Sequence, residues 1–208
     1  FKIPKGSRMF IYDSNRTMYL GSFTNENNYV NNRFGTEFIK GNSLIIEYYE
    51  PNKVDFEAQL HIENLVHSFV DIKAGPFCVN CSGVFGADSC NINVNCPLGY
   101  GWDREKRSVA LILGDYRKEY GDYNYYGWCS GTVINNTAQN GRPFFLSANH
   151  CIDSPMESTL DWLFLFNHEA QNCTDDGSSV SSYLGQSVYG ALVLSKDGYC
   201  SPTSDYLL

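Results

Sequence analysis

Short apolar runs between polar loops fill residues 1–75 and predict antiparallel β-structure. Residues 8–13 and 18–21 are apolar segments on either side of a turn-like Asp-Ser-Asn sequence, which is the pattern of a β-hairpin. Residues 43–50 are rich in β-branched and aromatic side chains and end at a proline. Partial alternation of apolar positions over residues 58–69 predicts a further strand. We expect a small antiparallel β-sandwich in this part of the chain.

A second series of apolar runs begins after Trp102 and continues to the last residue. The runs recur at intervals typical of β-barrels and sandwiches, at residues 107–113, 128–134, 143–148, 162–166, 188–194 and 206–208. Residues 114–127 are polar and rich in tyrosine, so we expect a long loop between two strands there. Gly75-Pro76 and Ser82-Gly83 indicate a junction between the two regions, at residues 76–88. The expected fold class is therefore all-β.

Composition and charge narrow the class of protein. The 208 residues are 43% hydrophobic and 18% charged, which is enough apolar material for a core and too little charge for a disordered chain. The net charge of −8 argues against nucleic acid or an anionic membrane as the main partner. All eight cysteines lie after residue 77. Scattered cysteines in this number favour an oxidising compartment, so we expect a secreted, extracellular protein.

The most informative stretch runs from Cys129 to Cys151, with the sequence CSGTVINNTAQNGRPFFLSANHC. Two apolar strands flank a polar turn, and a disulfide between the two terminal cysteines would tie these strands together. The same bond would fix the turn that carries His150. A general base needs such fixing, because a small displacement of the imidazole slows proton transfer. A histidine beside a cysteine is nevertheless structural in most proteins.

This stretch resembles the histidine region of trypsin-like serine proteases, in which a Cys-x-Gly strand is followed by a strand ending in His-Cys. More closely, the chain resembles the bacterial secreted lysyl endopeptidase branch of that family. The closer resemblance is carried by SCNINVNCPLG and WDREKRSV near residues 89–109, by VINNTA and RPFFL in residues 133–146, and by SDYLL at residues 204–208. Residues 1–75 resemble, less strongly, the β-rich propeptide that precedes such enzymes.

The resemblance implies a domain organisation. Residues 1–75 would be a propeptide-like β domain, residues 76–88 a linker, and residues 89–208 most of the N-terminal barrel of a two-barrel catalytic domain. The second barrel would be absent from the 208 residues. The chain would therefore be a fragment of a secreted serine endopeptidase precursor.

The resemblance also assigns residue roles. His150 takes the position of the general base, and Asp205 takes that of the carboxylate that orients it. The resemblance further implies a Cys96–Cys173 disulfide, and it supports the disulfide between Cys129 and Cys151.

The family nucleophile lies in a Gly-x-Ser-Gly sequence beyond the aspartate, and no such sequence follows Asp205 here. We therefore expect proteins or peptides as substrates, the missing C-terminal barrel of the same enzyme as a partner, and no activity from the 208 residues alone. No metal or organic cofactor is expected.

Two alternatives belong to other functional classes. Cys78-x-x-Cys81, with Cys90 and Cys96 nearby, has partial zinc-ligand spacing, but it lacks a second close cysteine pair. A secreted β-rich binding or adhesion module is the other alternative, because six aromatic residues cluster in one stretch: Tyr116, Tyr120, Tyr123, Tyr125, Tyr126 and Trp128.

Overall fold

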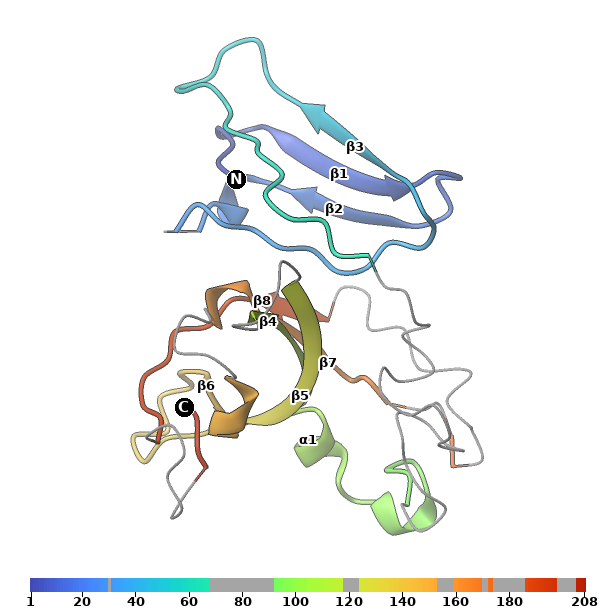
Figure 1. Cartoon of the computed structure of the whole chain (residues 1–208), viewed down its shortest axis with the longest axis vertical. Helices are drawn as coiled ribbons and strands as arrows, with labels where there is room; N and C mark the ends of the chain where they lie inside the picture. The colour runs from blue at the N-terminus through green and yellow to red at the C-terminus, as the bar shows by residue number, and fades with distance from the viewer. Residues whose placement is uncertain are drawn as a thin grey trace. The chain divides into compact units, whose positions relative to one another are not determined.

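The structure, a computed structural model, describes residues 1–29, 31–67, 92–117, 124–152, 159–169, 172–173, 186–197 and 205–208. The chain divides into two compact units, Phe1–Leu65 and Val66–Leu208. Within the described residues, each unit contains one antiparallel sheet, and helices are few and short (Figure 1). The all-β prediction is therefore confirmed. None of the helices in these ranges has the length and apolar composition that crossing a membrane requires.

The sheet of the first unit has the order β2-β1-β3. The central strand β1 (Arg8–Asp13) pairs with β2 (Tyr19–Phe23) and with β3 (Leu44–Tyr49). Met9 and Ile11 of β1 are buried together with Leu20 of β2, as period-two alternation requires. Partly buried side chains from the coil segments, including Phe34 and Ile39, pack against this cluster.

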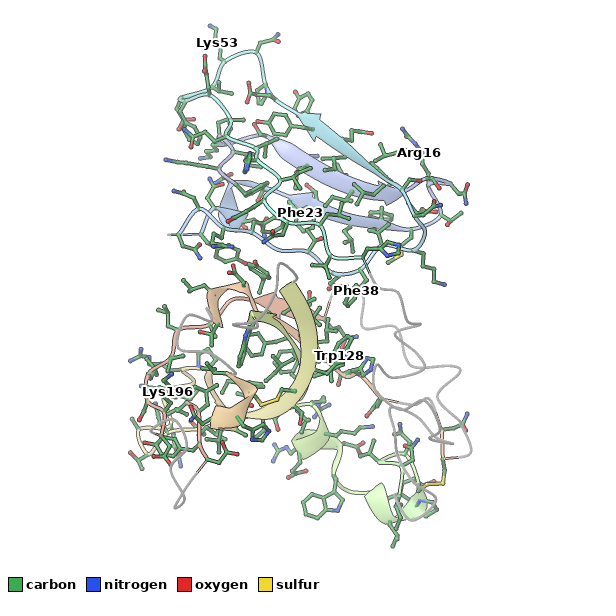
Figure 2. The ribbon with its side chains drawn as sticks, viewed as in Figure 1. Arg16, Phe23, Phe38, Lys53, Trp128 and Lys196 are labelled. Carbon is green, nitrogen blue, oxygen red and sulfur yellow. A yellow bond between two sulfur atoms is a disulfide. The ribbon has the colours of Figure 1, made fainter. Side chains whose placement is uncertain are left out.

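The β1–β2 turn is organised around Asp13. Its carboxylate accepts hydrogen bonds from the Met18 amide at 2.6 Å and from the Thr17 hydroxyl at 2.8 Å. These bonds, above all that from Met18, lower the pKa of Asp13 below its ordinary value. Arg16 lies in the same turn (Figure 2), and its guanidinium carbon is 5.3 Å from the centre of the Tyr12 ring. The turn is thus held by hydrogen bonds to the Asp13 carboxylate and by the contact of the Arg16 guanidinium with the Tyr12 ring.

The sheet of the second unit has five strands in the order β6-β5-β4-β7-β8. They are β4 (Val109–Arg117), β5 (Asn124–Ile134), β6 (Phe144–Ser147), β7 (Leu163–Phe166) and β8 (Ser187–Tyr189). Short helices lie between them: η4 (Pro97–Gly99), α1 (Asp103–Lys106), η5 (Asn149–Cys151) and η6 (Thr159–Asp161). Leu207 forms isolated bridges with both Ser147 and Lys196. The last residues of the chain therefore extend the sheet beyond β6.

One buried cluster of the second unit packs against this sheet. Ile112, Trp162 and Phe164 are buried there together with Cys151 and Leu207. A Cβ atom at Gly114 would lie 2.8 Å from the Trp162 indole nitrogen, so the glycine makes room for the largest core side chain.

Two predictions from the hydrophobic pattern were wrong. Residues 114–127 are not a loop throughout, because β4 and β5 remain paired as far as Arg117 and Asn124. Tyrosine has a high β-propensity, and the β4–β5 ladder extends into both ends of the tyrosine-rich sequence. Residues 58–67 form no strand beyond an isolated bridge between Lys2 and Gln59. Leu60 and Leu65 in this segment are exposed, and no strand in the described part of the chain forms a ladder with it.

Candidate active site

The β5–β6 hairpin supports the site. Gly131 of β5 lies opposite Ser147, the last residue of β6. A Cβ atom at Gly131 would come within 2.5 Å of the Leu146 carbonyl oxygen, and it would also collide with the Phe145 ring. Glycine therefore allows the two strands to approach closely at the point where the chain turns toward His150.

The Cys129–Cys151 disulfide fixes the turn that follows β6. It joins β5 to the last residue of η5, with the two Cα atoms 6.0 Å apart. Cys151 is 1% exposed and packs in the core of the second unit. His150 directly precedes this anchored residue. Its backbone position is thus held from one side by a covalent bond and a packed side chain.

Leu207 holds the other half of the site. Its amide and carbonyl form two 2.8 Å hydrogen bonds with the backbone of Ser147, and its side chain is 4% exposed in the same core. Asp205 lies two residues earlier in the chain. Its carbonyl oxygen accepts a hydrogen bond from the Asn149 amide. The short terminal segment is thereby fastened beside η5.

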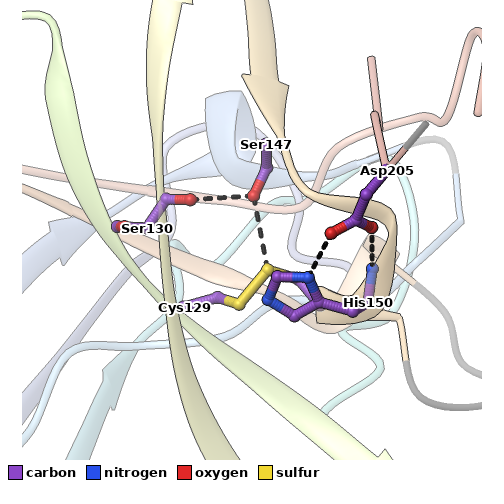
Figure 3. Close-up of a disulfide and its surroundings, with 6 residues drawn as sticks. Cys129, Ser130, Ser147, His150 and Asp205 are labelled. Atoms are coloured by element: carbon purple, nitrogen blue, oxygen red, sulfur yellow. Dashed lines mark hydrogen bonds and ion pairs between the residues drawn. A yellow bond between two sulfur atoms is a disulfide. The ribbon is translucent and has the colours of Figure 1, made fainter. Parts of the chain in front are cut away.

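His150 and Asp205, which are 55 residues apart in the sequence, meet through both carboxylate oxygens (Figure 3). Oδ2 of Asp205 lies 2.5 Å from Nδ1 of the imidazole, and Oδ1 accepts the His150 backbone N–H at 2.8 Å. Two contacts fix the carboxylate relative to both the ring and the main chain. Of the two side chains, His150 is 71% exposed and Asp205 is 51% exposed.

The electrostatics of the pair define what it can do. The hydrogen bond to the His150 ring, followed by the bond to its backbone amide, lowers the pKa of Asp205 below the ordinary value. The carboxylate is therefore ionised near neutral pH and can only accept hydrogen bonds. It selects the imidazole tautomer with a proton on Nδ1, which leaves Nε2 able to take up a proton. This arrangement suits a general base.

No serine hydroxyl among the described residues forms a hydrogen bond with His150. The nearby Ser147 hydroxyl instead donates to the Ser130 carbonyl oxygen at 2.8 Å and lies 3.5 Å from Sγ of Cys151 (Figure 3). Both serines thus hold the hairpin and the disulfide in place.

The structure describes some of the other residues that the sequence analysis named. Cys96 and Cys173 form a disulfide with Cα atoms 4.4 Å apart, away from the His150–Asp205 pair in the sequence. The possible zinc ligands Cys78, Cys81 and Cys90 lie outside the described residues, as do the linker at 76–88 and the proposed boundary at residue 75. The side chains of the tyrosine-rich stretch at 115–126 are likewise outside the description.

Sequence reasoning missed the anchoring role of Leu207. In the sequence it is one of two terminal leucines, and nothing local indicates a backbone pairing with Ser147, 60 residues earlier. The contact of Oδ1 of Asp205 with the main chain was missed for the same reason. The sequence offers one signal for this anchor. An apolar residue stands two positions after the candidate aspartate, and residues two apart lie on the same side of a strand.

The chain is similar in sequence to proteins of known family. Residues 85–208 match the family model described as "Lysyl endopeptidase, C-terminal domain". The chain is also 27% identical, over 175 residues, to a lysyl endopeptidase of Pseudomonas aeruginosa. That alignment covers 81% of this chain, so it extends into the part before residue 85, and it covers 36% of the relative. The chain thus spans about a third of the length of this relative.

Proposed function

The chain belongs to the lysyl endopeptidase family, and we propose from this that it is part of a secreted serine endopeptidase in which His150 is the general base and Asp205 the residue that orients it. The observation that carries the proposal is the two-point contact of the Asp205 carboxylate with the ring and backbone of His150. No local sequence pattern brings together two residues 55 positions apart. The contact supplies what the histidine of an acyl-transfer enzyme needs.

The proposed mechanism assigns each proton to an atom. Nε2 of His150 takes the proton of a serine hydroxyl as the serine oxygen attacks the scissile carbonyl. The ionised Asp205 stabilises the resulting imidazolium through Nδ1–H. His150 then gives its proton to the leaving amine, and an acyl-enzyme remains. A water molecule, deprotonated by His150, hydrolyses the acyl-enzyme and restores the serine.

Exposure of the imidazole fits this proposal. Because the His150 side chain is 71% exposed, a serine and a substrate could reach Nε2 without movement of the β5–β6 hairpin. No Gly-x-Ser-Gly sequence follows Asp205 within the 208 residues, so we propose that the nucleophile, the oxyanion hole and the specificity pocket come from a C-terminal barrel outside them. The name of the relative suggests cleavage after lysine. Residues 1–75 would serve as a propeptide.

The proposal is tested by measuring peptide hydrolysis with the protein in the form that its own organism produces. We expect amide substrates with lysine before the scissile bond to be cleaved faster than those with alanine. His150→Ala should lower kcat by roughly 10⁶-fold, and Asp205→Asn should lower it by roughly 10⁴-fold. The matched control is His61→Ala, which removes an exposed histidine of the first unit. Unchanged kcat in Asp205→Asn would contradict the assigned role.

The isolated 208-residue polypeptide provides a second test. We expect no turnover of a peptide ester and no labelling by a fluorophosphonate probe, since the covalent route needs the absent nucleophile. Stoichiometric labelling of a serine within these residues would overturn the proposed division of the active site.

A further inference from the structure

We propose that the first unit carries two cleavage sites for a lysine-specific endopeptidase, at the peptide bonds after Lys40 and after Lys53, and that cleavage of both removes strand β3. The inference rests on the proposed function, which supplies the lysine specificity. It makes the first unit a substrate of another, active copy of the same enzyme. The two bonds lie on either side of β3, so residues 41–53 leave as one peptide.

Both lysines lie in exposed coil. Residues 40–43 and 52–55 are exposed, and Figure 2 shows Lys53 on the loop that follows β3. Among the described residues, neither ammonium group forms an ion pair or a hydrogen bond, and the backbones of residues 40–42 and 52–55 form no hydrogen bond. Exposed loops of this kind are preferred sites of proteolysis, because a protease must bind its substrate as an open segment of chain.

The residues beside the Lys40 bond allow the chain to open. Gly41 has a φ of 106°, and a Cβ atom there would have no neighbour closer than 4.0 Å. Glycine can pass from this conformation to an extended one at little cost, since it has no side chain. Ile39 packs against the core of the first unit, so this contact must be released before Lys40 enters the cleft of a protease.

The other two described lysines of the first unit are protected. The backbone of Lys2 exchanges hydrogen bonds of 2.9 Å and 2.8 Å with that of Gln59. Lys5 stands in a turn between Pro4 and Ser7, which are both buried. The peptide bonds after these lysines therefore stay closed to a protease as long as the first unit is folded.

The described lysines of the second unit are held as well. Lys106 lies in α1, and its ammonium nitrogen is 3.1 Å from a carboxylate oxygen of Glu169. Lys196, labelled in Figure 2, forms an antiparallel bridge with Leu207. The placement of lysines therefore directs cleavage to the first unit and spares the unit that carries His150.

Strand β3 is held weakly once the chain is cut on both sides. It is an edge strand, and β1 is its neighbour in the sheet. Leu44, Ile45 and Ile46 are 40%, 36% and 40% exposed, so the strand buries little apolar surface, and Tyr48 is the β3 side chain that packs against the core cluster. A tether holds neighbouring segments at an effective concentration of millimolar order, so in a micromolar solution two cuts lower the local concentration of β3 roughly 10³-fold.

Loss of β3 opens the rest of the first unit. The strand lies beside Met9 and Ile11 of β1, so its departure uncovers two residues of the core. The hairpin that remains is marginally stable at best in water, and the bonds after Lys2 and Lys5 become accessible. Each cut adds one water molecule across a peptide bond, leaving a carboxylate on the lysine and an amine on the next residue. Removal of the first unit is therefore irreversible.

Limited proteolysis of the 208-residue chain tests the two sites. A purified lysine-specific endopeptidase is added, and Lys73 and Lys118, which lie outside the described residues, are replaced by arginine in every sample. Products are identified by mass spectrometry at successive times, and gel filtration shows whether peptide 41–53 stays with the chain. We expect the bonds after Lys40 and Lys53 to be cut first and the peptide to elute alone.

Arginine variants identify the bonds that control the loss of the first unit. Lys40→Arg/Lys53→Arg keeps both charges at exposed positions, so it should fold like the parent, and the added enzyme should leave its first unit intact while that of the parent is degraded. The protection should extend to the two N-terminal lysines, because they open when β3 is lost. Lys106→Arg/Lys196→Arg is the matched control and should lose its first unit as fast as the parent.

Degradation of the first unit of Lys40→Arg/Lys53→Arg at the parental rate would overturn the proposal. So would cleavage after Lys106 or Lys196 as early as after Lys40, or a peptide 41–53 that stays with the chain after both cuts. The added enzyme supplies the activity, so none of these results depends on His150. Failure of the proposed function would appear instead as a lack of hydrolysis of lysine peptides by the protein in the form that its organism produces.

Discussion

Removal of the Cys129–Cys151 bridge should destabilise the second unit by about 4 kcal/mol. The bond joins residues that are 22 positions apart. Constraining a loop of that length in the unfolded chain corresponds to about 3.4 kcal/mol at 25 °C in the chain-entropy model. Cys151 is also 1% exposed, so replacing it by alanine removes a buried sulfur and adds roughly 1 kcal/mol. The double variant Cys129→Ala/Cys151→Ala carries both losses.

Urea unfolding followed by tryptophan fluorescence measures this loss in the correct unit. All three tryptophans, Trp102, Trp128 and Trp162, belong to the second unit. Their fluorescence therefore reports that unit even if the first unfolds separately. Free energies are obtained by linear extrapolation to water.

The pair Cys96→Ala/Cys173→Ala is the control, because its bond spans 77 positions and corresponds to about 4.5 kcal/mol in the same model. It shows that the assay detects the loss of a cross-link in this unit. A loss below about 1 kcal/mol for Cys129→Ala/Cys151→Ala, with the control behaving as expected, would refute the role of the bridge as the anchor of the turn.

Three further predictions concern the packing and titration of single residues. Gly131→Ala should cost roughly 1–3 kcal/mol in the same urea assay, since its Cβ would meet the Leu146 carbonyl at 2.5 Å, whereas Ser130→Ala should change little. Burial lowers the pKa of His168 from 6.5 to about 4, so the stability of the second unit should fall as pH drops from about 6.5 toward 4. The loss of unfolding free energy is at most about 3 kcal/mol, and nearer 1–2 kcal/mol after allowance for the partial exposure of the ring. In urea unfolding, the His168→Gln variant should not show this pH-dependent loss. Hydrogen bonds lower the pKa of Asp13, so acidification below the ordinary pKa of 3.8 should progressively release the Met18 amide. The release is measured as faster hydrogen exchange of that amide. The Asp13→Asn variant should show the faster exchange at every pH.

The parts of the fold that the sequence predicts correctly depend on local patterns. The alternation in residues 8–13 corresponds to a strand whose inner residues are buried, and the two apolar runs joined by the polar turn correspond to the paired strands β5 and β6. The errors arise where partners decide the outcome. Residues 58–67 alternate in part but have no neighbouring strand, while the tyrosine-rich ends of β4 and β5 are polar but pair with each other.

The candidate site was accessible from the sequence through resemblance rather than through local physics. His150 stands in a distinctive hairpin that two cysteines delimit, so its restraint could be anticipated from the residues themselves. Asp205 could not, because the contact depends on Leu207 pairing with Ser147 across the sheet. Long-range backbone pairing of this kind leaves little trace in a five-residue segment.

Nitrogen-15 NMR of the His150 ring tests the central claim most directly, since that claim is that Asp205 holds the imidazole ready to act as a base. In the 208-residue chain, at a pH where the ring is neutral, we predict a proton on Nδ1 and none on Nε2. Asp205→Asn should shift the His150 ring toward the other tautomer. The NMR signals of the exposed His61 should be the same in the unaltered chain and in this variant. A ring protonated mainly on Nε2 in the unaltered chain would contradict the assignment of His150 and Asp205 as a catalytic pair.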